Sequence, residues 1–330
     1  MKKLASVLLV LVMLFGVTAF AMAEGPTIGV CIYQYNDNFM TLYRQELQKY
    51  LEEQGAVVTI MDGKNDQGEQ TNQINGFIAQ GVDVLIVNFV DPTAADAIIP
   101  LCEEAGIPLV LINREPYIDN PERWDEVWEK VCYVGADARQ SGTFQGNAVL
   151  SLPDQGDING DGVVSYIMIQ GDMANVDAQY RTEYSIKALT DAGLKVEKLF
   201  EHRGEWDQTK GQELAANALA QFGEQIEVVF CNNDGMALGA LQAIKDAGRT
   251  VGKDIYLLGV DALSEVVALV EAGEFTATVL NDHFGQSHTA ADLALEMAGG
   301  YIPEKRLYVV DYVAVTPETM EYVKNAIGME

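Results

Sequence analysis

The chain has 330 residues, and its 49 aspartates and glutamates outnumber its 21 lysines and arginines, which gives a formal net charge of −28. This acidity argues against nucleic acid and anionic membrane surfaces as partners, because both would repel the protein. The length exceeds what one ordinary hydrophobic core takes up, so two lobes are expected.

The first 23 residues have the pattern of a cleaved secretory signal. Two lysines at positions 2 and 3 precede an apolar run over residues 4–20, and residues 21–23 read A-M-A, a small-x-small cleavage pattern. A transmembrane anchor is the competing interpretation. The run leads straight into the cleavage pattern, however, and no cysteine at the cut could take a lipid. We therefore expect a soluble exported protein, in the periplasm or another extracytoplasmic space.

Short apolar runs alternate with helical patterns along almost the whole chain. The strand-like runs lie near residues 27–33, 82–89, 107–113, 164–170, 195–200, 226–231, 254–260 and 276–280. The helical patterns lie near residues 39–54, 177–193, 208–221, 235–247 and 284–298. Apolar strands separated by helices are typical of parallel sheets covered on both faces. The expected fold class is α/β, with two lobes that each have their own sheet.

The four cysteines, Cys31, Cys102, Cys132 and Cys231, form no C-x-x-C pair and have no regular spacing. A zinc site is therefore not expected. Cys31 and Cys231 lie in apolar strand patterns, where a free cysteine serves as a small hydrophobic residue. Export would permit a disulfide between Cys102 and Cys132, and the sequence leaves that question open.

Residues 157–168 read D-I-N-G-D-G-V-V-S-Y-I-M and match the first part of a calcium-binding loop. The oxygen ligands would come from Asp157, Asn159, Asp161, the Val163 carbonyl and Ser165. The twelfth position is Met168, whose thioether is a poor calcium ligand, and the residues around it are typical of a strand. The loop is therefore not an EF-hand. It is either a plain surface turn or a cation site that a glutamate from elsewhere completes.

Asparagines and aspartates follow most of the predicted strands, at the sheet edges where parallel folds bind ligands. They include Asp37, Asn88, Asp91, Asp177, Asn233, Asp234, Asp261 and Asn281. Each could instead cap a helix, and Asp91 and Asp234 are expected to do so. Such side chains also bond hydroxyl groups, while Phe39 and Trp206 could cover both faces of a pyranose ring and Arg181 adds a fork of donors. Together they predict a site for a neutral polyol.

These segments resemble the bacterial periplasmic galactose/glucose-binding proteins, which are type I periplasmic sugar-binding proteins. The likeness rests on the metal loop and on I-Y-Q-Y-N-D-N-F-M (32–40), V-D-A-Q-Y-R (176–181), I-E-V-V-F-C-N-N-D-G (226–235), G-V-D-A-L (259–263) and T-V-L-N-D (278–282). It implies two Rossmann-like lobes joined by a three-strand hinge. The N-terminal lobe would take residues 24–132 and about 283–310. The C-terminal lobe would take about 135–281 and 313–330, and would carry the calcium loop.

The resemblance also assigns roles to single residues. Sugar hydrogen bonds fall to Asp37, Asn88, Asp177, Arg181, Asn233, Asp261 and Asn281, and stacking falls to Phe39 and Trp206. Asn175 stands where the family has a histidine beside the sugar, and Ser165 stands where it has a glutamine at the metal. Glu227 would close the shell of a structural calcium ion. These two departures put a strict preference for glucose or galactose, and a family-like calcium affinity, in doubt.

The implied function is binding without catalysis. A monomer would capture a monosaccharide, glucose or galactose, between its closing lobes and deliver it to a membrane ABC sugar importer, with a chemotaxis receptor as an optional second partner. One alternative is a protein for another aldose, such as a pentose. Another is a sensory protein without transport. A glycoside hydrolase is disfavoured, because His202, His283 and His288 form no recognisable nucleophile-base arrangement.

Overall fold

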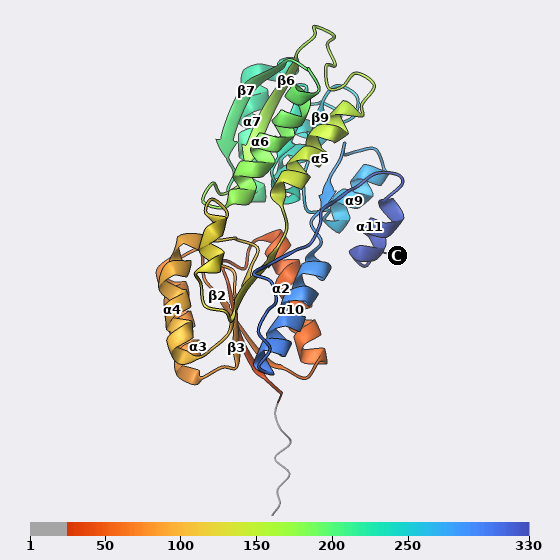
Figure 1. Ribbon diagram of the computed structural model, residues 1–330. Helices are drawn as coiled ribbons and strands as arrows, with labels where there is room; N and C mark the ends of the chain where they lie inside the picture. Colours follow the sequence, from red (N-terminus) through yellow and green to blue (C-terminus); the bar gives the residue numbers. More distant parts are fainter. Residues whose placement is uncertain (1–24, 330) are drawn as a thin grey trace, which may run out of the picture.

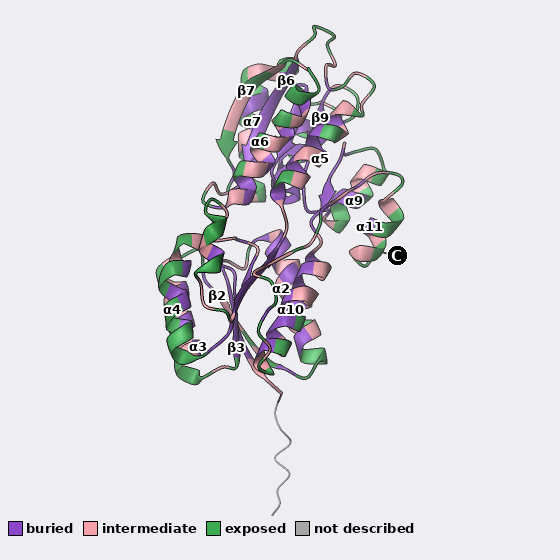
Figure 2. Cartoon of the chain, viewed as in Figure 1, coloured by how far each residue is buried: buried purple, intermediate pink, exposed green. Residues whose placement is uncertain are grey.

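The computed structural model describes residues 25–329, so the predicted signal sequence at residues 1–23 lies outside the described part. Figure 1 shows two α/β lobes, one above the other, with the chain passing between them more than once. The central strands of each lobe are buried, and the outward faces of the helices are exposed (Figure 2). These features confirm the predicted fold class.

The N-terminal lobe is built on a six-stranded parallel sheet with the strand order β11-β5-β4-β3-β1-β2. Its strands are β1 (Thr27–Ile32), β2 (Val57–Asp62), β3 (Val84–Val87), β4 (Leu109–Ile112), β5 (Val131–Gly135) and β11 (Leu307–Val309). Strand β11 comes from near the end of the chain and pairs with β5. This lobe is therefore assembled from both halves of the sequence.

Helices cover both faces of this sheet, because successive strand side chains point to opposite sides. One face packs on α2 (Asn38–Glu53) and α10 (His283–Ala298), and the other on α3 (Gln67–Gln80) and α4 (Ala95–Ala105). Val30 of β1 lies in the first core, and the next residue, Cys31, lies in the second. Two short 3-10 helices, η1 (Pro92–Ala94) and η2 (Pro121–Asp125), complete the lobe. Asp91 caps η1, as predicted.

The C-terminal lobe has a four-stranded parallel sheet with the order β7-β6-β8-β9. The small antiparallel pair β10–β12 continues past β9 through isolated bridges. The strands are β6 (Val164–Gln170), β7 (Val196–Arg203), β8 (Val228–Cys231), β9 (Tyr256–Leu258), β10 (Val279–Leu280) and β12 (Val313–Ala314).

Helices cover this second sheet on both faces as well. Their bounds are α5 (Ala138–Leu150), α6 (Val176–Asp191), α7 (Gln208–Phe222), η3 (Gly223–Gln225), α8 (Asp234–Asp246), α9 (Ser264–Glu271) and α11 (Met320–Ala326). Helices α5 and α6 pack on one face, and α7 and α8 on the other. Helix α5 approaches α6 so closely that a Cβ on Gly146 would lie 2.5 Å from the Ser185 carbonyl oxygen. A glycine is therefore required at this helix contact.

The chain crosses between the lobes at three places. The crossings are residues 136–137 between β5 and α5, residues 281–282 between β10 and α10, and residues 310–312 between β11 and β12. Figure 1 shows these segments running side by side in the middle of the molecule. The loops that follow the strands of the two sheets therefore face each other across the gap between the lobes.

All four cysteines are buried and free, which answers the question that the sequence left open for Cys102 and Cys132. Burial raises the pKa of both thiols to about 12, so they stay protonated at neutral pH. Within residues 25–329, no helix is long and apolar enough to cross a membrane.

Candidate functional site

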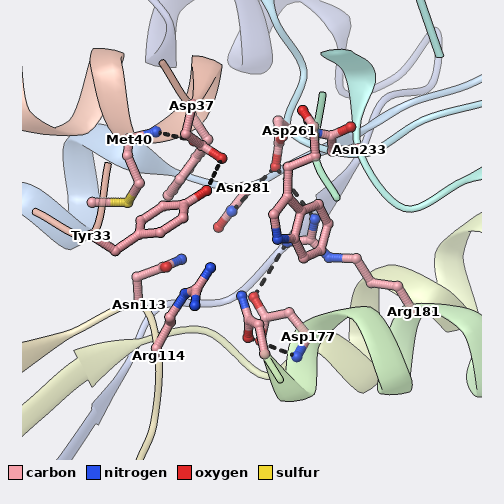
Figure 3. Close-up of a pocket in the computed structure, with 13 residues that line it drawn as sticks. Tyr33, Asp37, Met40, Asn113, Arg114, Asp177, Arg181, Asn233, Asp261 and Asn281 are labelled. Atoms are coloured by element: carbon pink, nitrogen blue, oxygen red, sulfur yellow. Dashed lines mark hydrogen bonds and ion pairs between the residues drawn. The ribbon is translucent and has the colours of Figure 1, made fainter. Parts of the chain in front are cut away.

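A cavity lies between the lobes, at the facing edges of the two sheets. Its walls are Tyr33, Asp37, Phe39, Met40, Asn113, Arg114, Asn175, Asp177, Arg181, Trp206, Asn233, Asp261 and Asn281. The space between these side chains, including the part open to solvent, is about 310 Å³. Figure 3 shows polar groups from both lobes pointing into it.

Asp37 anchors the wall that the N-terminal lobe provides. One of its carboxylate oxygens accepts a hydrogen bond from the Met40 amide at 2.7 Å and so caps α2. The other accepts one from the Tyr33 hydroxyl, also at 2.7 Å. Both oxygens are thereby fixed in direction, and each keeps a lone pair for a ligand hydroxyl.

Asn88 does not line the cavity, which departs from the expectation that it bonds the sugar. It is fully buried behind the wall, where its Nδ2 donates to the Ile112 carbonyl at 3.3 Å and to Asn113 Oδ1 at 3.1 Å. Asn113 occupies the wall instead, with a left-handed backbone at φ +62° that turns its side chain away from β4. Asn88 thus supports the residue that faces the ligand space.

Arg114 is the main wall residue that sequence reasoning missed. Its side chain is only 1% exposed, and its guanidinium lies 4.0 Å from the centre of the Tyr33 ring. Nη1 donates to the Val90 carbonyl at 2.6 Å and pairs with Asp172 at 3.2 Å. Within residues 25–329, Nε and Nη2 have no hydrogen-bond partner. In the sequence, the N-R pair at residues 113–114, where the strand-like run at 107–113 ends, was the feature that could have indicated it.

Arg181 organises the wall of the C-terminal lobe. Nη1 donates to the Asn232 carbonyl at 2.7 Å, and Nη2 donates to the Tyr312 hydroxyl at 2.9 Å. Asp177 lies 3.5 Å away and Asp261 lies 3.7 Å away, so one cation faces two carboxylates. Nε has no partner within the described residues.

Burial dominates the electrostatics of these carboxylates. It raises the pKa of Asp177 to about 6, against the opposing effect of the Arg181 and Arg114 charges. Burial likewise raises the pKa of Asp261 well above its usual range, although the Arg181 charge opposes the shift. A ligand that donates hydroxyl protons to these oxygens would replace part of the hydration they have lost.

Three asparagine amides complete the polar wall. The carbonyl oxygen of Asn175 caps α6 by accepting from the Asp177 amide at 3.0 Å, and that of Asn233 caps α8 by accepting from Met236 at 2.9 Å. Asn281 accepts from Gln286 at 2.6 Å and donates to Asp261 at 3.3 Å. Because the caps occupy the oxygens, Asn175 can present its NH₂ group as a donor to the cavity, and Asn233 can present the N–H that does not donate to the Trp206 carbonyl at 3.4 Å.

Two aromatic rings line the cavity from opposite lobes. Phe39 lies in the first turn of α2 and packs edge-on against His283, with ring centroids 6.5 Å apart. Trp206 has a left-handed backbone at φ +66°, and its indole packs on Gly171, where any Cβ would collide with the ring. The structure thus places both rings, and all of the predicted sugar-binding residues except Asn88, around one cavity.

The predicted metal loop and Glu227 lie together in the C-terminal lobe. The Glu227 carboxylate is 2% exposed, and its two oxygens accept from the Asn159 amide at 2.9 Å and the Ser165 amide at 2.8 Å. The Asp157 carboxylate accepts hydrogen bonds from the amides of residues 160–162, so the loop folds around this side chain. Glu227 therefore reaches across the loop, next to strand β8.

The donor chemistry of this loop fits a hard cation. The predicted ligands offer only oxygen atoms, and Glu227 forms no ion pair with any cationic side chain in the described part of the chain. The geometry is less direct, because no set of three or more His, Cys, Asp or Glu side chains in residues 25–329 is arranged to hold a metal ion. A cation would therefore need carbonyl, amide or hydroxyl oxygens in addition to the carboxylates.

Comparison with known proteins identifies the family. A model described as "Periplasmic binding protein domain" matches residues 28–301. The chain belongs to the periplasmic binding protein family. This membership confirms the predicted type I fold and makes the chain an extracytoplasmic solute-binding protein rather than an enzyme.

Several relatives of this periplasmic binding protein are similar over most of their length. It is 36% identical over 290 residues to the D-galactose/methyl-galactoside binding periplasmic protein of Haemophilus influenzae, covering 86% of this chain and 85% of that one. It is 35% identical over 289 residues to a putative rhizopine-binding protein of Rhizobium meliloti, covering 87% and 89%. The first of these confirms the resemblance to the galactose/glucose-binding proteins.

A solved structure gives the same result at the level of the fold. An ABC transporter solute binding protein from Bacillus halodurans with bound myo-inositol superposes with a TM-score of 0.78 at 28% identity. The match covers 92% of this chain and 99% of that one. The whole two-lobed architecture is therefore shared.

Proposed function

We propose that this protein captures a single monosaccharide in the cavity between its lobes and delivers it to a membrane ABC importer. Glucose and galactose are the first candidates. The observation that supports this is that carboxylates and buried NH donors converge on one cavity. Asp37, Asp177 and Asp261 can accept hydrogen bonds, while Arg114 and Arg181 have NH groups without a partner within residues 25–329. A hydroxyl both donates and accepts, so a ring rich in hydroxyls can satisfy both sets at once.

The charge balance favours a neutral ligand. Arg114 is already paired with Asp172, and Arg181 faces both Asp177 and Asp261. An anionic ligand would meet these carboxylates, and among residues 25–329 the cations that line the cavity are already paired. Phe39 and Trp206 on opposite lobes suit the apolar C-H faces of a sugar ring. The galactose-binding relative supports a hexose.

A cyclic polyol such as myo-inositol is the second candidate. The Nε and Nη2 groups of Arg114 form one edge of a planar fork, which can bond two neighbouring oxygens at once. Adjacent hydroxyls are present around an entire inositol ring. The neighbour with bound myo-inositol and the rhizopine-binding relative support this candidate. A pentose remains the smaller alternative.

Ligand capture works by lobe closure. Residues 24–132 with about 283–310 would move as one body, and about 135–281 with 313–330 as the other, about the three crossings. Only the closed form brings Asp37 and Asn113 to the same ligand as Arg181 and Asp261, so the ligand stabilises that form. A monomer suffices for this cycle. The importer, and a chemotaxis receptor as an optional second partner, would read the closed shape.

We propose calcium as a structural ion in the C-terminal lobe. Its ligands would be Asp157, Asn159, Asp161, the Val163 carbonyl, Ser165 and Glu227. The buried Glu227 carboxylate, which lies against an acidic loop, supports this assignment. The ion would tie the loop between α5 and β6 to the start of β8, and so stabilise the lobe without touching the ligand.

A thermal-shift panel tests the proposal. The purified mature protein is unfolded with glucose, galactose, ribose, arabinose or myo-inositol present, and a bound ligand at about a hundredfold excess over its Kd should stabilise by roughly 2.7 kcal/mol. A midpoint that none of these compounds moves would refute the proposal. Steady release of the aryl group from aryl galactosides or glucosides would favour the hydrolase alternative, and neighbouring genes without a permease would favour the sensory one.

A further inference from the structure

Asp261, a wall residue of the cavity, has an unusual backbone conformation. Its φ is +120°, and the following Ala262 has a φ of +53°. Residues with a Cβ rarely adopt either value, so neighbouring groups must hold this turn in place. The turn directs the Asp261 carboxylate toward Arg181, 3.7 Å away, and into the ligand space.

Asp234 makes several of the hydrogen bonds that fix this turn, although it does not line the cavity. Its side chain is completely buried. One carboxylate oxygen accepts from the Leu263 amide at 2.9 Å, and the other accepts from the Thr278 hydroxyl at 2.7 Å. The Asp234 amide donates to the Val260 carbonyl at 2.7 Å. The residue thus contacts the chain on both sides of Asp261.

Thr278 closes the same turn from the adjacent strand segment. Its hydroxyl donates to Asp234 and accepts from the Ala262 amide at 3.3 Å. The Asp261 amide itself donates to the Val279 carbonyl at 2.8 Å. All three amides of the turn, residues 261–263, therefore have partners, and two of the three partners are the side chains of Asp234 and Thr278.

The position of Asp234 differs from the sequence expectation that it caps a helix. Asn233 caps α8, and Asp234 is the first helical residue, with its carboxylate directed to the turn. Gly259 makes room for it, because a Cβ at that position would collide with the Asp234 carboxylate. A buried carboxylate is costly unless hydrogen bonds satisfy it, so the turn and the carboxylate stabilise each other.

We propose that Asp234 and Thr278 are positioning residues that lock the 261–263 turn, and thereby set the Asp261 carboxylate for the ligand before the ligand binds. The inference rests on the proposed function, since it assigns Asp261 a ligand contact. Asn233, the neighbour of Asp234, lies on the same wall. One residue therefore fixes the relative position of two wall side chains, which lowers the cost of organising the site on binding.

A double-mutant cycle with D-glucose and D-galactose as probes tests the coupling. Thr278→Val removes the hydroxyl and should weaken binding of the bound sugar at least tenfold. Asp261→Asn should weaken binding as well. The affinity of the double variant should be at most about threefold lower than that of Asp261→Asn alone. Fold losses that simply multiply would overturn the proposal, because Thr278 would then act independently of Asp261.

Two controls separate positioning from general stability. Thr276→Val removes the same hydroxyl two residues earlier, where it accepts from the Leu257 amide at 2.9 Å, and should leave the affinity unchanged. Thr278→Ser keeps the hydroxyl and should restore the affinity. Equal losses of affinity in Thr276→Val and Thr278→Val would assign the effect to the fold of the lobe, and would overturn the proposal.

Amide hydrogen exchange tests the inference without a variant or a ligand. In the ligand-free wild-type protein, the amides of Ala262 and Leu263 should exchange at least a hundredfold more slowly than an unprotected amide. Fast exchange that slows only when sugar binds would overturn the proposal, because the turn would then be organised by the ligand. If the protein binds none of the compounds in the thermal-shift panel, the proposed function fails, whereas this exchange measurement still decides whether the turn is locked.

Discussion

Arg114 and Asp172 form an ion pair of 3.2 Å that joins the two lobes beside the cavity. Arg114 follows β4 of the N-terminal lobe, and Asp172 follows β6 of the C-terminal lobe. Among the ion pairs formed within residues 25–329, this pair is the one that connects a loop of the N-terminal sheet to a loop of the C-terminal sheet. In the proposed closure cycle, opening of the lobes would separate the two side chains, so the pair would stabilise the closed form and hold the Arg114 fork over the cavity.

Removing the acidic partner should weaken ligand retention. In Asp172→Asn, we expect a Kd for the bound sugar about three- to tenfold higher, since a partly exposed ion pair is worth roughly 1 kcal/mol. Most of the change should lie in a faster dissociation rate, measured by stopped-flow fluorescence. Asp191→Asn breaks the exposed Lys187–Asp191 pair inside one lobe and is the control. An unchanged dissociation rate in Asp172→Asn would contradict the role in closure.

Substitution of Arg114 should cost more than substitution of Asp172. Arg114→Lys retains the positive charge but loses the planar fork whose Nε and Nη2 are unpartnered. We expect binding to weaken at least about tenfold, because charge-assisted bonds to the ligand are lost as well as the link between the lobes. Isothermal titration would measure this. An affinity equal to that of Asp172→Asn would show that the fork does not touch the ligand.

The pair of Asn88 and Asn113 shows what sequence patterns could and could not establish. Both follow strands of one sheet, and the resemblance assigned the ligand bond to Asn88. The structure buries Asn88 completely and gives Asn113 a left-handed backbone that turns it toward the cavity. The sign of the backbone φ angle cannot be predicted from a single sequence, although asparagine tolerates a positive φ better than most residues. Arg114 was not predicted as a wall residue, because it follows Asn113, whose left-handed backbone sets the direction of the chain at this point.

More of the fold than of the site could be predicted from the sequence. The helix predicted at 284–298 is α10 at His283–Ala298, and that at 208–221 is α7 at Gln208–Phe222, because both have long amphipathic patterns. Strand β2 was not predicted, since this edge strand is half exposed and lacks a continuous apolar run. Strands β10 and β12 have two residues each, too few to give any pattern. Their pairing depends on where the chain crosses between the lobes.

Asn175 provides a test in which stability and affinity should separate. Its carbonyl oxygen caps α6, while its NH₂ group is free to face the ligand. Asn175→Ser keeps a capping oxygen but removes the NH₂ donor, without placing a second carboxylate beside the buried Asp177. The thermal midpoint of the ligand-free protein should stay nearly constant, whereas the affinity should fall at least about tenfold. Asn175→Ala is the comparison, and should lose about 1 kcal/mol of stability through the cap.

The buried carboxylates should make the stability of the ligand-free protein fall as the pH rises. Burial raises the pKa of Asp234 to about 7 and that of Asp177 to about 6, whereas an unfolded aspartate titrates near 4. Between about pH 4 and 7 the folded state therefore holds protons that the unfolded state has released. The contribution of these two groups to stability is fully present below this range and is lost as the pH rises through it.

Asp234→Asn isolates this effect from other titrating groups. His283 acts in the opposite direction, because burial lowers its pKa and so favours the folded state at higher pH. The comparison is therefore between wild type and variant at each pH, by urea unfolding at constant calcium. The variant should gain stability relative to wild type between pH 5 and pH 8. A difference that stays constant across this range would contradict a raised pKa for Asp234.

Calcium removal should destabilise the C-terminal lobe. With calcium at about a hundredfold excess over its Kd, the bound ion would contribute roughly 2.7 kcal/mol, and a chelator should remove this contribution and lower the thermal midpoint. Glu227→Gln should reproduce most of the loss and make the protein insensitive to the chelator, since the amide cannot replace a bidentate carboxylate. Equal midpoints with and without chelator in the wild type would make the loop a plain turn.

Asp154→Asn is the matched control for the metal test. Asp154 lies just before the loop and accepts hydrogen bonds from the Gly156 amide and the Tyr256 hydroxyl, but it is not among the predicted ligands. This variant should be destabilised by lost hydrogen bonds and still respond fully to the chelator. If it also lost the response, acidity near the loop in general, rather than the Glu227 carboxylate in particular, would account for the binding of calcium.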